Sequence, residues 1–154
     1  MSALRPTLEG RLVNASVISV IDDDASVRAA TDNLLSSYGY IVHTFASAEE
    51  FLQSTHLNGT SCVVADVQMP TMSGLDLLSH VRARGYDAPF LFITAFPEES
   101  VRARVSKAGG IGFLAKPFAA SDLIKCVETA LRRRDAGRDG SGQVHLLVGC
   151  LRRL

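Results

Sequence analysis

Three short apolar runs in this sequence are each followed by charged side chains. The acidic cluster Asp22-Asp23-Asp24 follows the first run, Asp66 follows the second and Lys116 follows the third. A carboxylate at the end of a buried strand loses solvation, which is unfavourable unless another group compensates. The pattern therefore indicates one shared site in which acids and a base offset one another.

Converging carboxylates repel one another, so a hard divalent cation is their natural partner. Mg²⁺ takes oxygen ligands, typically one or two carboxylates together with water and phosphate oxygens. We expect Asp23 and Asp66 to be direct ligands and Asp22 to act directly or through water. Asp24 is expected to cap the following helix.

The same residues fit phosphoryl transfer, in which an aspartate attacks phosphorus and forms an aspartyl-phosphate. This chemistry needs mainly positioning and charge neutralisation. The cation and the Lys116 ammonium would neutralise charge, and the Thr94 hydroxyl would donate a hydrogen bond to a phosphoryl oxygen. Ala95, beside Thr94, is small enough to leave access.

The elements that position these residues alternate along the chain. Five apolar runs, each rich in Val, Ile or Phe, have the length and composition of buried parallel strands: Val17–Ile21, Tyr40–Phe45, Cys62–Ala65, Phe90–Thr94 and Ile111–Ala115. Segments with helical spacing lie between and after them. Five strands alternating with five helices predict an α/β protein with a parallel sheet covered on both faces. Ligands bind beyond the carboxyl ends of such strands.

Several local signals mark where the predicted helices begin and end. Ser47 with Glu50 forms a capping-box pattern, and Ser73 is placed to cap the next helix. Gly39, Gly85 and the pair Gly109-Gly110 follow helical stretches, where a left-handed residue is expected.

Length and composition predict a single domain, since the chain has 154 residues and 47% hydrophobic content. The net charge is zero, so charge gives no argument for nucleic-acid or membrane binding. Residues 1–16 contain neither a signal-peptide core nor a membrane-length apolar run. We therefore expect a soluble, cytoplasmic protein. The predicted organisation is an N-terminal tail over 1–15, a domain over 16–134 and a flexible C-terminal tail over 135–154.

The motif residues resemble the signature of bacterial two-component response-regulator receiver domains, of the CheY-like superfamily. The similarity extends from about Ser16 to Arg134, in the family's order and spacing, through Asp22-Asp23, Asp66, Met69-Pro70, Gly74, Thr94-Ala95 and Lys116-Pro117-Phe118. The segments Ser47-Ala48-Glu49-Glu50-Phe51 and Ile93-Thr94-Ala95 are further similar to the FixJ-type subfamily.

This resemblance implies a flavodoxin-like (βα)₅ fold, with a doubly wound, five-stranded parallel sheet. It also implies phosphorylation of Asp66, with Mg²⁺, by a sensor histidine kinase or a histidine phosphotransfer protein. The implied roles are the metal-binding acidic pair for Asp22 and Asp23, a metal-binding backbone carbonyl for Gln68, the switch hydroxyl for Thr94, the phosphate contact for Lys116 and the aromatic switch position for Phe113.

We expect the kinase to dock against the first helix, Ala25 to Tyr38, and phosphorylation to favour a homodimer through the fourth helix, fifth strand and fifth helix. FixJ-type members usually carry a helix-turn-helix domain, but only residues 135–154 follow the last predicted helix here. We therefore expect no DNA-binding or other output domain in this chain, and no membrane partner.

Three alternatives remain open at this stage. The chain is a stand-alone receiver that passes on phosphate or binds a target directly, or part of a transcriptional regulator whose DNA-binding half is missing, or a metal-dependent phosphohydrolase. Such hydrolases usually place a second aspartate two residues after the nucleophile, where this chain has Gln68. We therefore expect a protein that is not an enzyme.

Overall fold

The computed structural model describes residues 4–6 and 12–137 of the chain. The described elements are, in order, β1 (Leu4–Pro6), β2 (Leu12–Asn14), β3 (Val17–Ile21), α1 (Ala25–Ser37), β4 (Ile41–Phe45), α2 (Ala48–Gln53), β5 (Cys62–Asp66), α3 (Gly74–Ala83), β6 (Phe90–Thr94), α4 (Glu99–Ala108), β7 (Gly112–Ala115) and α5 (Ala120–Gly137).

Five of these strands form one parallel sheet in the order β4-β3-β5-β6-β7. The first and third strands of the alternating pattern, β3 and β5, are therefore neighbours at the centre, with the chain winding outward on both sides. This is the strand order of the flavodoxin-like fold, and it confirms the predicted doubly wound sheet. All five residues of β5 and of β6 are buried, as their apolar composition predicts.

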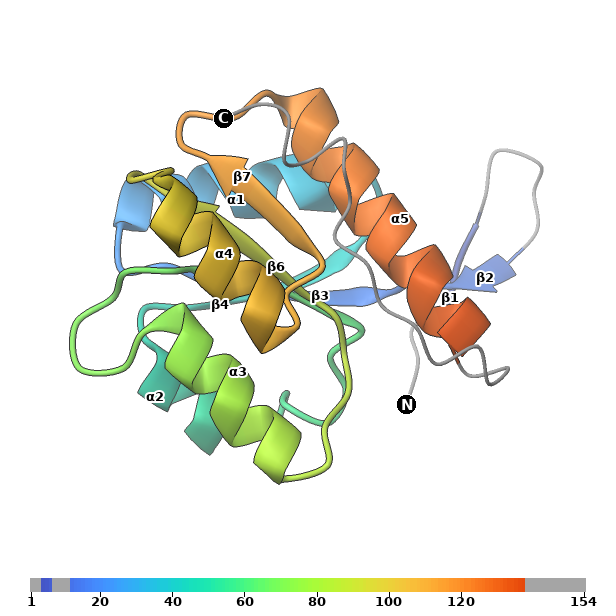
Figure 1. The fold of residues 1–154 in the computed structure, drawn as a ribbon. Helices are drawn as coiled ribbons and strands as arrows, with labels where there is room; N and C mark the ends of the chain where they lie inside the picture. Colours follow the sequence, from blue (N-terminus) through green and yellow to red (C-terminus); the bar gives the residue numbers. More distant parts are fainter. Residues whose placement is uncertain (1–3, 7–11, 138–154) are drawn as a thin grey trace.

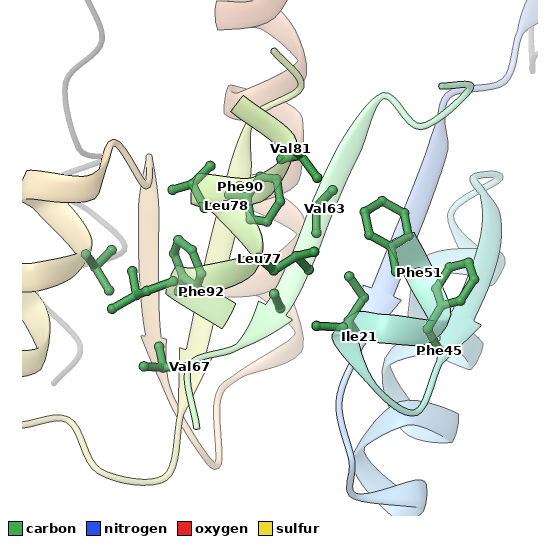
Figure 2. Packing of buried hydrophobic residues seen from close by; sticks show 14 of the residues in the cluster. Ile21, Phe45, Phe51, Val63, Val67, Leu77, Leu78, Val81, Phe90 and Phe92 are labelled. Atoms are coloured by element: carbon green, nitrogen blue, oxygen red, sulfur yellow. The ribbon is translucent and has the colours of Figure 1, made fainter. Parts of the chain in front are cut away.

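The helices cover both faces of the sheet (Figure 1). One apolar cluster packs α2, α3 and α4 against the sheet, and a second cluster packs α1 and α5 against the opposite face. Figure 2 shows part of the first cluster, in which Leu77, Leu78 and Val81 of α3 lie close to Phe90 and Val63. The result is a three-layer α/β arrangement that holds the strand ends in fixed register.

Helix ends follow the predicted signals closely. The Asp24 side chain accepts hydrogen bonds from the backbone N–H groups of Ser26 and Val27, so it caps α1 as expected. Ser73 and Asp76 form a complete capping box at α3. Ser47 caps α2, although the Glu50 carboxylate accepts from the N–H of Ala46 and not from that of Ser47. Among the glycines expected at helix ends, the left-handed conformation is found at Gly39, Gly85 and Gly109, the first of the Gly109-Gly110 pair.

Two further glycines allow close packing around the ring of Phe92. A Cβ atom at Gly74 would collide with the carbonyl oxygen of Asp66 and lie 3.1 Å from the Phe92 ring. A Cβ atom at Gly110, just after α4, would lie 2.7 Å from the same ring and from Val105. The beginning of α3 and the end of α4 can therefore approach β6 only because both positions lack a side chain.

Differences from the sequence prediction concern the ends of the chain and the ends of elements. The segment predicted as an N-terminal tail contains β1 and β2, which pair as a two-stranded antiparallel sheet. Helix α5 continues to Gly137, three residues beyond the predicted domain end at 134. The remainder of the predicted flexible tail, 138–154, lies outside the described residues. No helix in the described part of the chain has the length and apolar character needed to cross a membrane.

Candidate functional site

The predicted site residues come together at one edge of the sheet. Asp66 is the last residue of β5 and Thr94 the last residue of β6, while Asp22 and Lys116 directly follow β3 and β7. Because the strands are parallel, their carboxyl ends meet at the same edge. Asp22 and Asp66 lie where β3 and β5 are neighbours and the strand order reverses, the place where open α/β sheets bind ligands.

Lys116 connects the two buried acids. Its Nζ lies 2.8 Å from Asp22 Oδ2 and 3.1 Å from Asp66 Oδ2. Asp22 is completely buried and Asp66 is 5% exposed, so both carboxylates depend on protein groups for compensation. The Lys116 backbone N–H donates to the Thr94 carbonyl oxygen at 2.8 Å, which fixes the start of the lysine loop against β6.

The electrostatics of the site follow from this geometry. Burial, and next the charge of Asp22, raise the pKa of Asp66 to about 6, against the opposing effect of Lys116. For Lys116, burial lowers the pKa, but hydrogen bonds and charge from Asp22 and Asp66 outweigh burial, and the net shift is upward. Lys116 therefore stays positively charged, and its one ammonium group compensates both Asp22 and Asp66.

The acidic residues present a donor set suited to a hard cation. One carboxylate oxygen from each of Asp22, Asp23 and Asp66 lies within 4.8 Å of the others. Asp22 Oδ1 accepts from the N–H of Asp24, and the buried Oδ2 is paired with the Lys116 ammonium. Three carboxylates that converge in this way, with only one ammonium group paired to two of them, fit a divalent cation with oxygen ligands.

Thr94 and Gln68 meet beside this cluster. The buried Thr94 hydroxyl donates to the Gln68 side-chain oxygen at 2.7 Å and accepts from the backbone N–H of Phe96 at 2.9 Å. The backbone N–H of Gln68 donates to Asp66 Oδ1 at 3.2 Å. The hydroxyl predicted to serve the phosphoryl group is therefore held by a neighbouring amide in this structure.

Phe113 lies in the core, away from the charged groups. Its side chain is completely buried in the cluster that includes Phe92, its register partner on β6, and Val105 of α4. Such burial fits ordinary core packing. Phe113 also lies two residues before Ala115, the register partner of Thr94.

Two contributions to the site could not be anticipated from the sequence. The Arg28 Nη1 atom on α1 donates to the Asp22 carbonyl oxygen at 2.7 Å, which ties the acidic loop to the helix. The side-chain oxygen of Gln68 accepts a hydrogen bond from the Thr94 hydroxyl, a contact that the sequence does not predict. Neither contact has a sequence signal, because each depends on how a loop is folded.

A shallow apolar groove of about 510 Å³ lies next to the site. It is lined by the α1 residues Val27, Ala30, Thr31 and Leu34, and by Lys116, Pro117, Phe118 and Ala120. Lys116 thus belongs both to the groove and to the acidic cluster.

The chain matches the family model described as "Response regulator receiver domain" over residues 18–128, which is most of its length. The chain belongs to the response regulator receiver domain family. The matched region begins on β3 and ends on α5, so it contains every site residue described above. Family and geometry therefore point to the same edge of the sheet.

Individual relatives of this receiver domain are consistent with that membership. It is 38% identical over 135 residues to the transcriptional regulatory protein TdiR of Thauera aromatica, covering 86% of this chain and 60% of TdiR. It is 36% identical over 118 residues to the transcriptional regulatory protein FixJ of Bradyrhizobium diazoefficiens, covering 77% of this chain and 58% of FixJ. This chain thus spans less than two thirds of either relative.

Among solved structures, the receiver domain is similar to the chemotaxis protein CheY4 of Vibrio cholerae, with a TM-score of 0.71 and 27% identity. The similarity covers 76% of this chain and 99% of that one. The likeness to FixJ agrees with the FixJ-type features noted in the sequence.

Proposed function

We propose that this chain is the phosphoacceptor receiver of a two-component signalling system, and that Asp66 accepts the phosphoryl group. The observation that carries the proposal is the pairing of Asp66 with a lysine at 3.1 Å, within a cluster of three carboxylates at the edge of a parallel sheet. The phosphodonor is a phosphohistidine of a sensor histidine kinase or of a histidine phosphotransfer protein.

In the proposed reaction, an Asp66 carboxylate oxygen attacks phosphorus. A P–O bond forms to Asp66, the P–N bond breaks, and the electron pair of that bond returns to the imidazole nitrogen. Lys116 is placed to offset negative charge on the phosphoryl oxygens, since its ammonium already lies 3.1 Å from Asp66. The buried surroundings strengthen this interaction relative to water.

The acidic cluster fits Mg²⁺, with ligands from Asp22, Asp23, Asp66 and the backbone carbonyl of Gln68. When bound, the cation would neutralise charge on the transferring phosphoryl group. Arg28 and the Asp24 N–H hold the Asp22 backbone and side chain in place for this role.

The switch in our proposal begins at Thr94. A phosphoryl group on Asp66 brings extra charge and acceptor oxygens, which draw in the Thr94 hydroxyl and Lys116. Movement of Thr94 leaves space for Phe113 to turn, which alters the surface of α4, β7 and α5. The change is a shift in population between two conformations.

Docking of the phosphodonor is proposed in the groove beside α1. The groove is apolar and includes Lys116, so a partner helix seated there would lie next to the phosphoacceptor. This proposal makes Ala30 an informative position, because it lines the groove and is not one of the three clustered aspartates. Ala30→Glu is expected to slow phosphotransfer from a histidine kinase while leaving labelling by acetyl phosphate unchanged.

We further propose that the phosphorylated form associates as a homodimer through α4, β7 and α5. Sedimentation with and without beryllium fluoride and Mg²⁺ tests this directly. A larger sedimentation coefficient with the phosphoryl mimic is expected, and identical behaviour in both conditions would remove the dimer from the proposal.

The proposed protein acts in the cytoplasm as a signalling switch and not as an enzyme that turns over free substrates. Position 68, where a hydrolase of the aspartate class carries its general acid, is a glutamine whose side chain is engaged by Thr94. Multiple-turnover release of phosphate from small esters would contradict this, and cell fractionation tests the location.

The decisive experiment is incubation with acetyl phosphate, with and without Mg²⁺, followed by mass spectrometry. We expect one acid-labile phosphoryl group on Asp66 that depends on Mg²⁺. Asp66→Asn should abolish labelling, whereas Asp87→Asn, a change at an exposed aspartate, should not. Labelling that persists in Asp66→Asn would refute the assignment.

A further inference from the structure

The hydroxyl of Thr94 is fully engaged in this structure. Its side chain is completely buried, it donates to Gln68 Oε1 at 2.7 Å, and it accepts from the N–H of Phe96 at 2.9 Å. A hydroxyl has one proton to donate. That proton is committed to Gln68 and not to the Asp66 carboxylate.

A phosphoryl group on Asp66 offers only acceptor oxygens, so it must take the same proton. Donation from Thr94 to the phosphoryl group therefore requires the Thr94–Gln68 hydrogen bond to break. We propose that Gln68 is a positioning residue that holds Thr94 in the resting arrangement and thereby opposes the switch. This inference rests on the proposed role of Thr94 as the hydroxyl that binds the phosphoryl group.

The placement of Gln68 suits this role. Its backbone N–H donates to Asp66 Oδ1 at 3.2 Å, so the same residue contacts the phosphoacceptor through its backbone and the switch hydroxyl through its side chain. The preceding residue, Val67, is held against β6, because its N–H donates to the Ile93 carbonyl at 2.9 Å. The backbone of Gln68 is thus anchored next to Thr94.

The side chain of Gln68, by contrast, belongs to an exposed residue. Its amide can exchange the Thr94 hydroxyl for water when the bond breaks, so no buried polar group is left without a partner. The interaction is therefore a reversible restraint on Thr94.

Phe96 offers a way to observe this restraint. Its N–H donates to the Thr94 hydroxyl, and the residue is 60% exposed. When Thr94 moves towards Asp66, the Phe96 backbone loses its acceptor and the loop after β6 must rearrange. The chain contains no tryptophan, so Phe96→Trp introduces a single fluorescent reporter at this loop.

The test is a titration of the Phe96→Trp protein with beryllium fluoride in the presence of Mg²⁺. Gln68→Met keeps a side chain of similar length but removes the acceptor. We expect it to lower the concentration for half-maximal response by about two- to tenfold, the range that corresponds to one net hydrogen bond. Gln53→Met, a change at an exposed glutamine that ends α2, should leave the midpoint unchanged. An unchanged or higher midpoint in Gln68→Met overturns the proposal.

A second pair of variants separates this role from a general effect of the loop. In a Thr94→Val background the donor is absent, so Gln68→Met should cause no further change in the midpoint of the beryllium fluoride titration. In Thr94→Ser the hydroxyl is kept, and the effect of Gln68→Met should persist. An equal effect of Gln68→Met with and without the hydroxyl would show that Gln68 acts by another route.

The outcomes also distinguish this inference from the proposed function on which it rests. If acetyl phosphate labels Asp66 normally but Gln68→Met changes nothing, the restraint on Thr94 is wrong and the phosphoacceptor assignment stands. If Asp66 is not labelled and beryllium fluoride gives no response in the reference protein, both are overturned.

Discussion

A Cβ atom at Gly74 would collide with the carbonyl oxygen of Asp66, so α3 begins against the end of β5 only because residue 74 has no side chain. The Gly74 N–H also donates to the Val67 carbonyl oxygen at 3.0 Å. This close approach closes the loop that carries Gln68 and holds the backbone of Asp66.

Gly74→Ala is therefore expected to destabilise the protein by about 1–3 kcal/mol, the usual consequence of forcing an atom into a packed site. Urea denaturation gives the free energy of unfolding. Gly59→Ala is the matched control, since a Cβ there meets only the His56 carbonyl oxygen at 3.9 Å. Equal stabilities of the two variants would contradict the packing argument.

The pKa of Asp66 predicts an unusual dependence of stability on pH. Its folded-state value of about 6 lies above the ordinary 3.8, so the folded protein binds this proton more tightly than the unfolded chain does. The contribution of Asp66 to stability therefore falls as pH rises from about 4 to 6 and stays unfavourable above that. Protonation in this window removes the cost of burying the Asp66 charge and its repulsion with Asp22.

In buffer with a chelator, Asp66→Asn should consequently be more stable than the parent by about 2 kcal/mol at pH 7. The gain should shrink as pH falls from 6 towards 4. Thermal unfolding across this range measures it. A variant that is less stable than the parent at pH 7 would show that the Lys116 pair outweighs burial of the charge.

Lys116 compensates two buried acids, so its removal should leave both without a counter-charge. Lys116→Met is expected to destabilise the protein by about 2–3 kcal/mol at pH 7, less than a fully buried pair because the lysine is partly exposed. Adding Mg²⁺ should restore more stability to this variant than to the parent. Lys107→Met, at an exposed lysine on α4, is the control and should change little.

Tyr86 ties the loop after α3 to the start of the central strand. Its hydroxyl donates to the Thr60 carbonyl oxygen at 2.6 Å, and burial raises its pKa to about 12. Tyr86→Phe should lower the free energy of unfolding by about 1 kcal/mol. Tyr38→Phe alters a side chain that is 59% exposed and should have no comparable effect.

The strands and the convergence of the site were predictable because each depends on a local pattern. The apolar run Cys62 to Ala65 needs a buried strand, and Asp66 at its end then lies at the sheet edge whatever the loops do. Asp24 and Ser73 cap helices through contacts two or three residues away, which sequence spacing encodes.

The features that were not predicted from the sequence depend on loop conformation and tertiary contacts. The hydrogen bond between Thr94 and Gln68 joins the last residue of β6 to the loop after β5, and no spacing rule selects an amide over a carboxylate as the acceptor. The contact from Arg28 to the Asp22 carbonyl requires the orientation of α1 to be known. The pairing of β1 with β2 was missed because two three-residue strands give too short a pattern to read.

The ring of Phe92 lies between two positions without side chains, Gly74 at the beginning of α3 and Gly110 beyond α4. Because glycine has no side chain, neither Gly74 nor Gly110 can make room for the ring by changing a rotamer. An inward shift of one helix end must therefore displace the ring or the main chain behind it. The width of the Phe92 ring in this way sets the spacing between α3 and α4. Phe92 lies two residues before Thr94 on β6, so the two side chains are directed to the same side of the sheet.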